Sequence, residues 1–80
     1  MKLSVYSLKN ILFQGEALSL NCKTTEGEIT VLDHHEPLIT VLSGGPVKII
    51  DADEKEHFFE IKSGFLEVRP GNEARCIVEQ

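Results

Sequence analysis

The sequence predicts an all-β domain, folded as a flattened β-sandwich or barrel of about nine or ten short strands. Three observations carry this prediction. The apolar runs are short and rich in β-branched or aromatic residues, and turn-forming residues separate them. Several runs alternate apolar and polar residues, as strands with one buried face do. No segment has the length and periodicity of an amphipathic helix.

The first part of the chain is expected to form strands at residues 3–6, 10–13 and 16–22. Gln14-Gly15 is expected to be the turn between the second and third of these strands. In the third strand, simple alternation puts Leu18, Leu20 and Cys22 on one face.

Six further strands are expected, at residues 27–32, 38–42, 46–51, 56–62, 65–69 and 74–78. Gly, Pro, Asn and Asp clusters separate them. The 38–42 and 46–51 runs are apolar on both faces, which predicts that both faces are covered. In so small a domain, a partner protein can provide the second cover.

Length and charge limit the possible functions. Eighty residues suffice for one domain, 1–80, and not for an enzyme with its own cofactor domain. The 13 acidic against 8 basic residues, with a net charge of −5, argue against nucleic-acid binding. No apolar run is long enough to cross a membrane, and the N-terminal residues do not resemble a signal peptide.

The residues that most often carry chemistry do not form a recognisable active site. Cys22 and Cys76 have no neighbouring cysteine and lie in apolar runs, so we expect two reduced, buried thiols. No nucleophile elbow or phosphate-binding glycine motif occurs. The acidic segment 51–56 lacks the pattern of a calcium loop and predicts a solvated hairpin tip. The sequence therefore predicts neither a catalytic residue nor a cofactor.

The segment Asp33-His34-His35-Glu36 contains four consecutive potential metal ligands. Adjacent side chains of an extended chain point to opposite sides, so these four cannot converge on one ion without a turn. A polar turn ended by Pro37 is the simpler interpretation. A small metal-binding β-barrel that uses His34, His35 and Glu36 remains an alternative.

Read in order, the turns resemble a known family, the epsilon subunit of F-type ATP synthases (delta in mitochondrial naming). The family signature T-x-x-G-E-h-x-h-L-P-x-H-A-P-h, with h hydrophobic, is similar to residues 24–38, T-T-E-G-E-I-T-V-L-D-H-H-E-P-L. The stretches 13–17, 45–49 and 58–68 resemble three further family segments, and Pro70-Gly71-Asn72 resembles its last hairpin. The resemblance is collinear over essentially the whole chain and implies the family's N-terminal β-sandwich domain, with the C-terminal helical hairpin absent.

The resemblance implies a rotor component without an active site or small-molecule substrate. Such a domain links the gamma subunit to the ring of c subunits and couples proton flow to ATP synthesis, peripherally, at the cytoplasmic face of the bacterial inner membrane. Outer apolar residues of the 38–42 or 47–50 runs would contact gamma. Family positions near the ring or gamma match two groups of residues: Glu26, Gly27 and Glu28, and then His35, Pro37 and Leu38.

Three positions depart from the family pattern. Asp33 stands where the signature has Pro, Glu36 where it has Ala, and Ser63 where it has Gly. These departures indicate altered partner surfaces. A stand-alone β-sandwich adaptor that binds other proteins is the alternative function.

Overall fold

The strands run antiparallel except at one pair. The computed structural model describes all 80 residues and contains eight strands and no helix. They are β1 (Lys2–Tyr6), β2 (Ile11–Thr24), β3 (Gly27–Leu32), β4 (Leu38–Leu42), β5 (Gly45–Asp51), β6 (Glu56–Ile61), β7 (Ser63–Arg69) and β8 (Glu73–Glu79). β1 and β8 are the parallel pair, with Leu3 opposite Ala74 and Val5 opposite Cys76. The expected all-β fold is confirmed.

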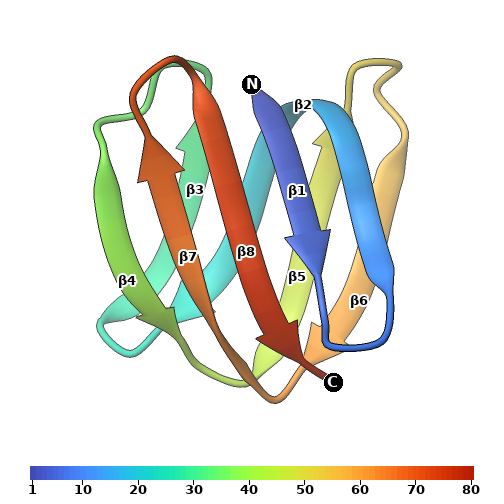
Figure 1. Cartoon of the computed structure of the whole chain (residues 1–80), viewed down its shortest axis with the longest axis vertical. Coiled ribbons are helices and arrows are strands. Elements are labelled where there is room, and N and C mark those ends of the chain that lie inside the picture. Colours follow the sequence, from blue (N-terminus) through green and yellow to red (C-terminus); the bar gives the residue numbers. More distant parts are fainter.

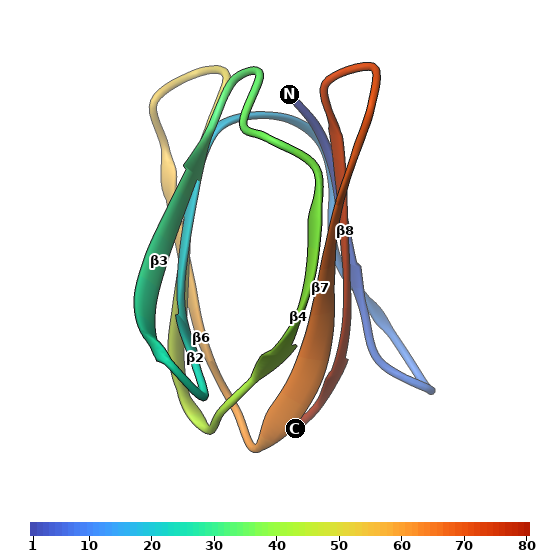
Figure 2. The same cartoon turned by 90° about the vertical axis from the view of Figure 1, so that its left-hand side faces the viewer.

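Two layers of strands face each other across the core (Figure 2). One layer runs β4-β7-β8-β1 and continues into the first half of β2; the other contains β3, the second half of β2, β5 and β6 (Figure 1). At one side, Thr24 of β2 pairs with Leu42 of β4 and joins the layers. The molecule is therefore a flattened sandwich whose strands form one continuous hydrogen-bonded sheet.

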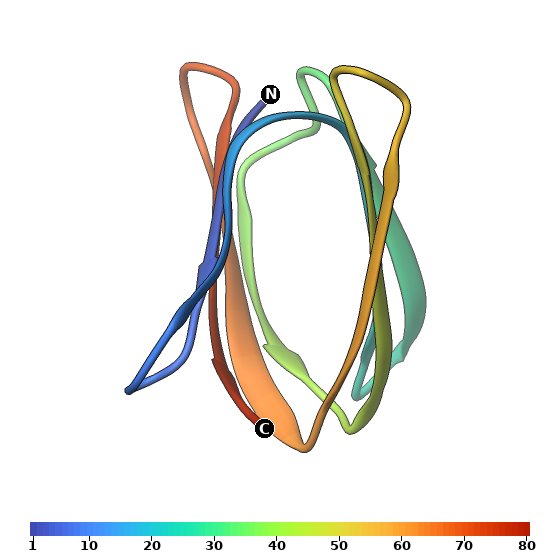
Figure 3. The ribbon, with the colours of Figure 1, turned by 90° about the vertical axis from the view of Figure 1, so that its right-hand side faces the viewer.

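β2 is a single strand of 14 residues, so the turn expected at Gln14-Gly15 is wrong and the strand count falls to eight. The strand arches from one layer to the other (Figure 3). Gly15 adopts φ 147° at this bend, a value that side chains disfavour, and a Cβ there would meet no other atom. Pairing with β1 ends at Glu16, and pairing with β5 begins at Ala17. The glycine bends the chain without ending the strand.

A β-bulge in β2 overturns the expected alternation of its side chains. The register with β5 shifts between Ala17 and Ser19, leaving Leu18 without a partner there. As a result Ala17 is buried and Leu18 is 43% exposed, although Leu20 and Cys22 point inward as expected. The extra residue moves Leu18 from the core face to the outer face.

The core is made only of apolar side chains and the two cysteines. Sixteen buried residues from all eight strands form one cluster, with Leu20, Ile49 and Leu66 fully buried near its middle. No buried polar side chain lacks a hydrogen bond. Cys22 and Cys76 are free and buried, as expected, and desolvation raises the pKa of Cys22 to about 11. At neutral pH this thiol is protonated and therefore a poor nucleophile.

Gly64 allows β7 to pack tightly between β4 and β8. It pairs with Leu42 on one side and Val78 on the other. An added Cβ would lie 2.6 Å from the carbonyl oxygen of Ile77 and 3.0 Å from Cγ1 of Val78. Ser63, which replaces the first of the two family glycines, is exposed. The departure at Ser63 therefore falls at a position where a side chain has room.

Asp51 organises the hairpin between β5 and β6. Its Oδ1 accepts hydrogen bonds from the backbone N–H groups of Asp53 (2.8 Å) and Lys55 (2.9 Å), and its Oδ2 lies 2.8 Å from Nε2 of His57. The His57 ring also packs edge-on against Phe13 of β2, with 5.0 Å between the ring centroids. The acidic tip thus uses its first carboxylate to close the turn.

The Asp51 carboxylate is expected to make stability depend on pH. The hydrogen bond with His57, followed by that from Lys55, lowers the pKa of Asp51 below its ordinary value of 3.8. The unfolded chain therefore takes up this proton first, so the contribution is complete above about pH 4 and is lost as the pH falls through the lower folded pKa. We expect the melting-temperature difference between the protein and Asp51→Asn to be largest at pH 6 and to shrink towards pH 2. A difference that stays constant over this range would contradict the assignment.

Candidate functional site

The turn between β2 and β3 presents two unpaired carboxylates. Thr24 and Gly27 are opposite each other in the register, so Thr25 and Glu26 form a two-residue loop. The Thr24 hydroxyl donates to the Gly27 carbonyl (2.7 Å) and accepts from the Glu26 N–H (3.1 Å). Glu26 and Glu28 are exposed, and neither forms an ion pair within the chain. A rigid turn therefore holds this acidic surface, Glu26 to Glu28, in solvent.

The loop between β3 and β4 begins with a tight turn. The His35 N–H donates to the Leu32 carbonyl (3.2 Å), and His34 has φ 61°. A positive φ at the third residue alone indicates a type II turn, whose second position favours proline. Asp33 occupies that second position, where the family signature has Pro.

The partner residues expected in this loop differ in exposure. His35 is half-buried, with Nδ1 2.8 Å from the Glu36 carbonyl oxygen, and Pro37 is exposed. Leu38 is partly buried and packs against the core, so little of it is available to a partner. Glu36, the second departure from the signature, is exposed.

The two groups of expected site residues lie at opposite ends of the sandwich. β3 runs from Glu28 near one end to the loop with His35 at the other (Figures 1 and 2). The strand residues from Glu28 to Leu32 span about 13 Å at roughly 3.3 Å per residue, and the turn with His35 lies beyond Leu32. The structure brings together Glu26, Gly27 and Glu28, and separately His35 and Pro37. One flat partner surface at one end cannot touch both groups.

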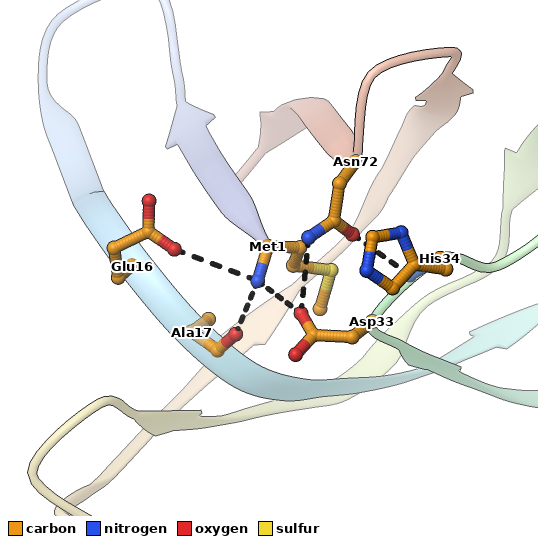
Figure 4. Close-up of polar contacts among 6 residues, drawn as sticks. All are labelled: Met1, Glu16, Ala17, Asp33, His34 and Asn72. Atoms are coloured by element: carbon orange, nitrogen blue, oxygen red, sulfur yellow. Dashed lines mark hydrogen bonds and ion pairs between the residues drawn. The ribbon is translucent and has the colours of Figure 1, made fainter.

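Asp33 anchors the β3–β4 loop in a polar cluster (Figure 4). Its Oδ1 accepts hydrogen bonds from the α-ammonium group of Met1 and from Nδ2 of Asn72 (3.3 Å). The Met1 ammonium also donates to the Ala17 carbonyl (2.9 Å), and Glu16 lies 3.6 Å from it. The bond from the Met1 ammonium, and then that from Asn72, lowers the pKa of Asp33. Proline at this position would make none of these contacts.

A row of apolar side chains crosses the outer face of the β4-β7-β8 layer. Val41 of β4 pairs with Phe65 of β7, and Phe65 pairs with Ile77 of β8. These three residues, here called the apolar row, are 46%, 58% and 45% exposed. Shallow hollows of about 470 and 230 Å³ flank it, and Phe65 and Ile77 line both. Water-exposed apolar residues in a contiguous patch indicate a binding surface.

The sequence predicted only part of this apolar face. The two-sided run at β4 does expose Ile39 and Val41, as expected. The run at β5 does not, because Lys48 faces solvent there and Ile50 is half-buried. Phe65 and Ile77 were missed, although each lies between two residues that point into the core and so had to point outward.

The acidic and histidine side chains do not form a metal-binding cluster. No group of three or more His, Cys, Asp or Glu side chains is arranged to bind a metal ion. His34, His35 and Glu36 therefore do not converge. The structure contains no helix that could span a membrane.

Comparison with known proteins shows the relationship directly. Residues 1–79 match the family model for the ATP synthase delta/epsilon chain, β-sandwich domain. The ATP synthase epsilon chain of Hydrogenovibrio crunogenus is 37% identical over 70 residues, which cover 88% of this chain and 48% of that protein. The epsilon chain of Bordetella avium is 38% identical over 72 residues, covering 90% and 51%. The chain thus spans about half the length of these relatives.

Two solved structures share the fold. A chain of the Euglena gracilis mitochondrial ATP synthase superimposes with a TM-score of 0.91 at 21% identity, covering all of this chain and 51% of that one. A chain of the Tetrahymena thermophila mitochondrial ATP synthase superimposes with a TM-score of 0.84 at 17% identity, covering 100% and 63%. At these identities the likeness concerns the fold alone. By the family match over residues 1–79, the chain belongs to the ATP synthase delta/epsilon chain β-sandwich family.

Proposed function

We propose that residues 1–80 form an epsilon-type N-terminal domain that acts in the central-stalk rotor of a proton-translocating F-type ATP synthase. In this role it is non-catalytic and links the gamma subunit to the c-ring, so that proton flow is coupled to ATP synthesis. The complex would lie at the cytoplasmic face of a bacterial inner membrane. The observation that carries the proposal is the family match over residues 1–79. The sandwich also exposes two surfaces of different chemistry, the acidic surface and the apolar row, which meet where the Thr25 N–H donates to the Val41 carbonyl (3.3 Å).

The acidic surface is assigned to the c-ring. Glu26 and Glu28 project from one end on a hydrogen-bonded turn, and neither forms an ion pair within the chain, although Lys23 lies opposite Glu28 in the register. A fixed pair of carboxylates suits the basic or polar loops of a ring, because complementary charge sets register and association rate. Gly27, with φ 128°, shapes the turn that carries them.

The apolar row and the β3–β4 loop are assigned to gamma. The row offers Val41, Phe65 and Ile77 as a contiguous apolar surface across three strands. Aromatic anchors that become buried dominate most protein interfaces, so Phe65 is the expected centre of this contact. His35 and Pro37 precede the other end of β4, and exposed Ile39 lies between them and Val41, so they would extend this surface away from the acidic turn. Two partners on two surfaces transmit rotation through the sandwich between them.

Glu28→Lys is expected to weaken binding to the c-ring. The change replaces an attractive charge with a repulsive one, and we expect about a tenfold loss of affinity, or about 1.4 kcal/mol. Purified c-ring in detergent is the probe, and ATP-driven proton pumping in reconstituted membranes is the functional readout. Pumping should fall while the isolated domain stays folded, because Glu28 is exposed and the new lysine faces only one like charge, Lys23 in the opposite strand, at a cost of at most about 1 kcal/mol.

Glu54→Lys is the matched control. It makes the same charge change on an exposed hairpin tip at the opposite end of the molecule. Ring affinity and pumping should match the unsubstituted protein. Equal losses of ring affinity in both variants would show that the effect comes from net charge alone. Unchanged pumping with Glu28→Lys would overturn the assignment of the acidic surface to the c-ring. Capture of neither gamma nor c-ring would favour the adaptor alternative.

A further inference from the structure

We propose that Asn72, in the turn between β7 and β8, is a positioning residue that sets the conformation of the β3–β4 loop and so of His35 and Pro37. Only its last step, the effect on gamma binding, rests on the proposed function. The effect on the loop can be measured in the isolated chain.

The side chain of Asn72 contacts the β3–β4 loop (Figure 4). Its Oδ1 accepts a 2.7 Å hydrogen bond from the His34 N–H, and its Nδ2 donates to the Asp33 carboxylate at 3.3 Å. Both ends of one amide therefore engage consecutive residues of a loop 38 and 39 positions earlier in the chain. The Asn72 backbone is itself fixed, because its carbonyl accepts a 3.0 Å hydrogen bond from Lys2 N–H of β1.

The β3–β4 turn needs such support because its own residues do not favour it. A type II turn favours Pro at its second position and Gly or Asn at its third, whereas this turn has Asp33 and His34. His34 must hold φ 61° in spite of its Cβ. The bond from its N–H to Asn72 fixes the peptide unit that joins these two residues. Asn72 thus stabilises the turn conformation through hydrogen bonds from another loop, whereas the proline of the family signature stabilises it within the turn itself.

The simpler role for Asn72 is to form its own hairpin turn. Its φ of 59° follows Gly71 at 88°, and asparagine tolerates such values better than most residues. Glycine would serve that role equally well but has no side-chain amide. Asn72→Gly therefore separates the two roles, since it keeps the hairpin conformation and removes both contacts to the loop.

Amide hydrogen exchange followed by NMR tests the loop directly. In Asn72→Gly, the His34 and His35 amides should exchange about fivefold faster, the loss expected for one hydrogen bond. Glu54→Gly is the matched control, because Glu54 also has a positive φ (64°) in a hairpin at the same end, and its side chain forms no hydrogen bond or ion pair. It should leave exchange at His34 and His35 unchanged.

Binding to purified gamma subunit tests the functional step. Asn72→Gly should lower affinity about fivefold, and Glu54→Gly should not. Adding Asp33→Pro to Asn72→Gly should restore most of the affinity, because proline pre-sets the second turn position and Leu32 before it is already extended. Unchanged exchange at His34 and His35 in Asn72→Gly would overturn the proposal. Faster exchange with unchanged gamma affinity would overturn its functional step, whereas an unsubstituted protein that binds no gamma would instead count against the proposed function.

Discussion

Gly64→Ala is expected to destabilise the domain by about 3 kcal/mol, the upper range for an overpacked site. The new Cβ would lie 2.6 Å from the Ile77 carbonyl oxygen, and β7 cannot move aside because β4 pairs with its other edge. An 80-residue domain has a total stability of roughly 4–12 kcal/mol, so the loss is a large fraction of it. Urea unfolding at 25 °C, with an unchanged m-value, measures the difference.

Ser63→Ala is the control for this substitution. Ser63 is the adjacent residue in β7 and its side chain is exposed, so the change should stay within about 0.5 kcal/mol. The pair also tests why the chain keeps one glycine of the family pair and not the other. A Gly64→Ala variant as stable as Ser63→Ala would show that β7 and β8 have room for a side chain at Gly64.

Leu20→Ala is expected to cost about 3 kcal/mol of unfolding free energy, since it leaves a cavity in a core that has little apolar volume to spare. Leu20 is fully buried and pairs with Val31 and Ile49, at the point where β2 binds both β3 and β5. Calorimetry should show a fall in melting temperature of at least about 12 °C, at 4–8 °C per kcal/mol for a domain of this size.

Leu18→Ala provides the matched control, with the same substitution two residues earlier in the same strand. Leu18 lies at the bulge and is 43% exposed, so the cost should remain below about 1 kcal/mol. Unbroken alternation would place both leucines in the core and give two similar losses. Equal effects of the two substitutions would therefore refute the bulge.

The sequence pattern predicted strands correctly where apolar and polar residues alternate without interruption. Residues 65–69 alternate apolar and polar side chains, and Leu66 and Val68 point inward as this alternation indicates; Cys76 is buried, as expected. Gly15 was misjudged because a glycine that bends a strand has the same local sequence signal as one that ends it, and Leu18 was misjudged because the bulge after Ala17 has no such signal. The choice depends on β1, which precedes β2 and pairs with it before the bend, and on β5, which pairs with β2 after the bend and comes two strands later in the chain.

In the candidate site, too, the sequence predicted local turns but not contacts between distant segments. The turn signal placed Glu26 and Gly27 in a tight hairpin, and the structure agrees. Local sequence patterns do not show which distant segments lie close together in the fold. They therefore did not predict that Glu28 and His35 lie at opposite ends of the sandwich. The contact between Asp33 and Asn72 joins residues 39 positions apart, which explains why the role of Asp33 emerged only from the folded chain.

The parallel pair of β1 and β8 has a consequence for synthesis of the protein. Of the eight strands β1 is made first and its partner β8 last, so one edge of β1 stays unpaired until residues 73–79 have been translated. Pairing between strands this far apart in the sequence is slow, because closing the long loop costs conformational entropy before the new hydrogen bonds stabilise the pair. A nascent chain still in the ribosomal exit tunnel at residues 73–79 keeps one β1 edge open, and an open strand edge invites aggregation. We therefore expect chaperone protection to matter most in the moments before β8 emerges.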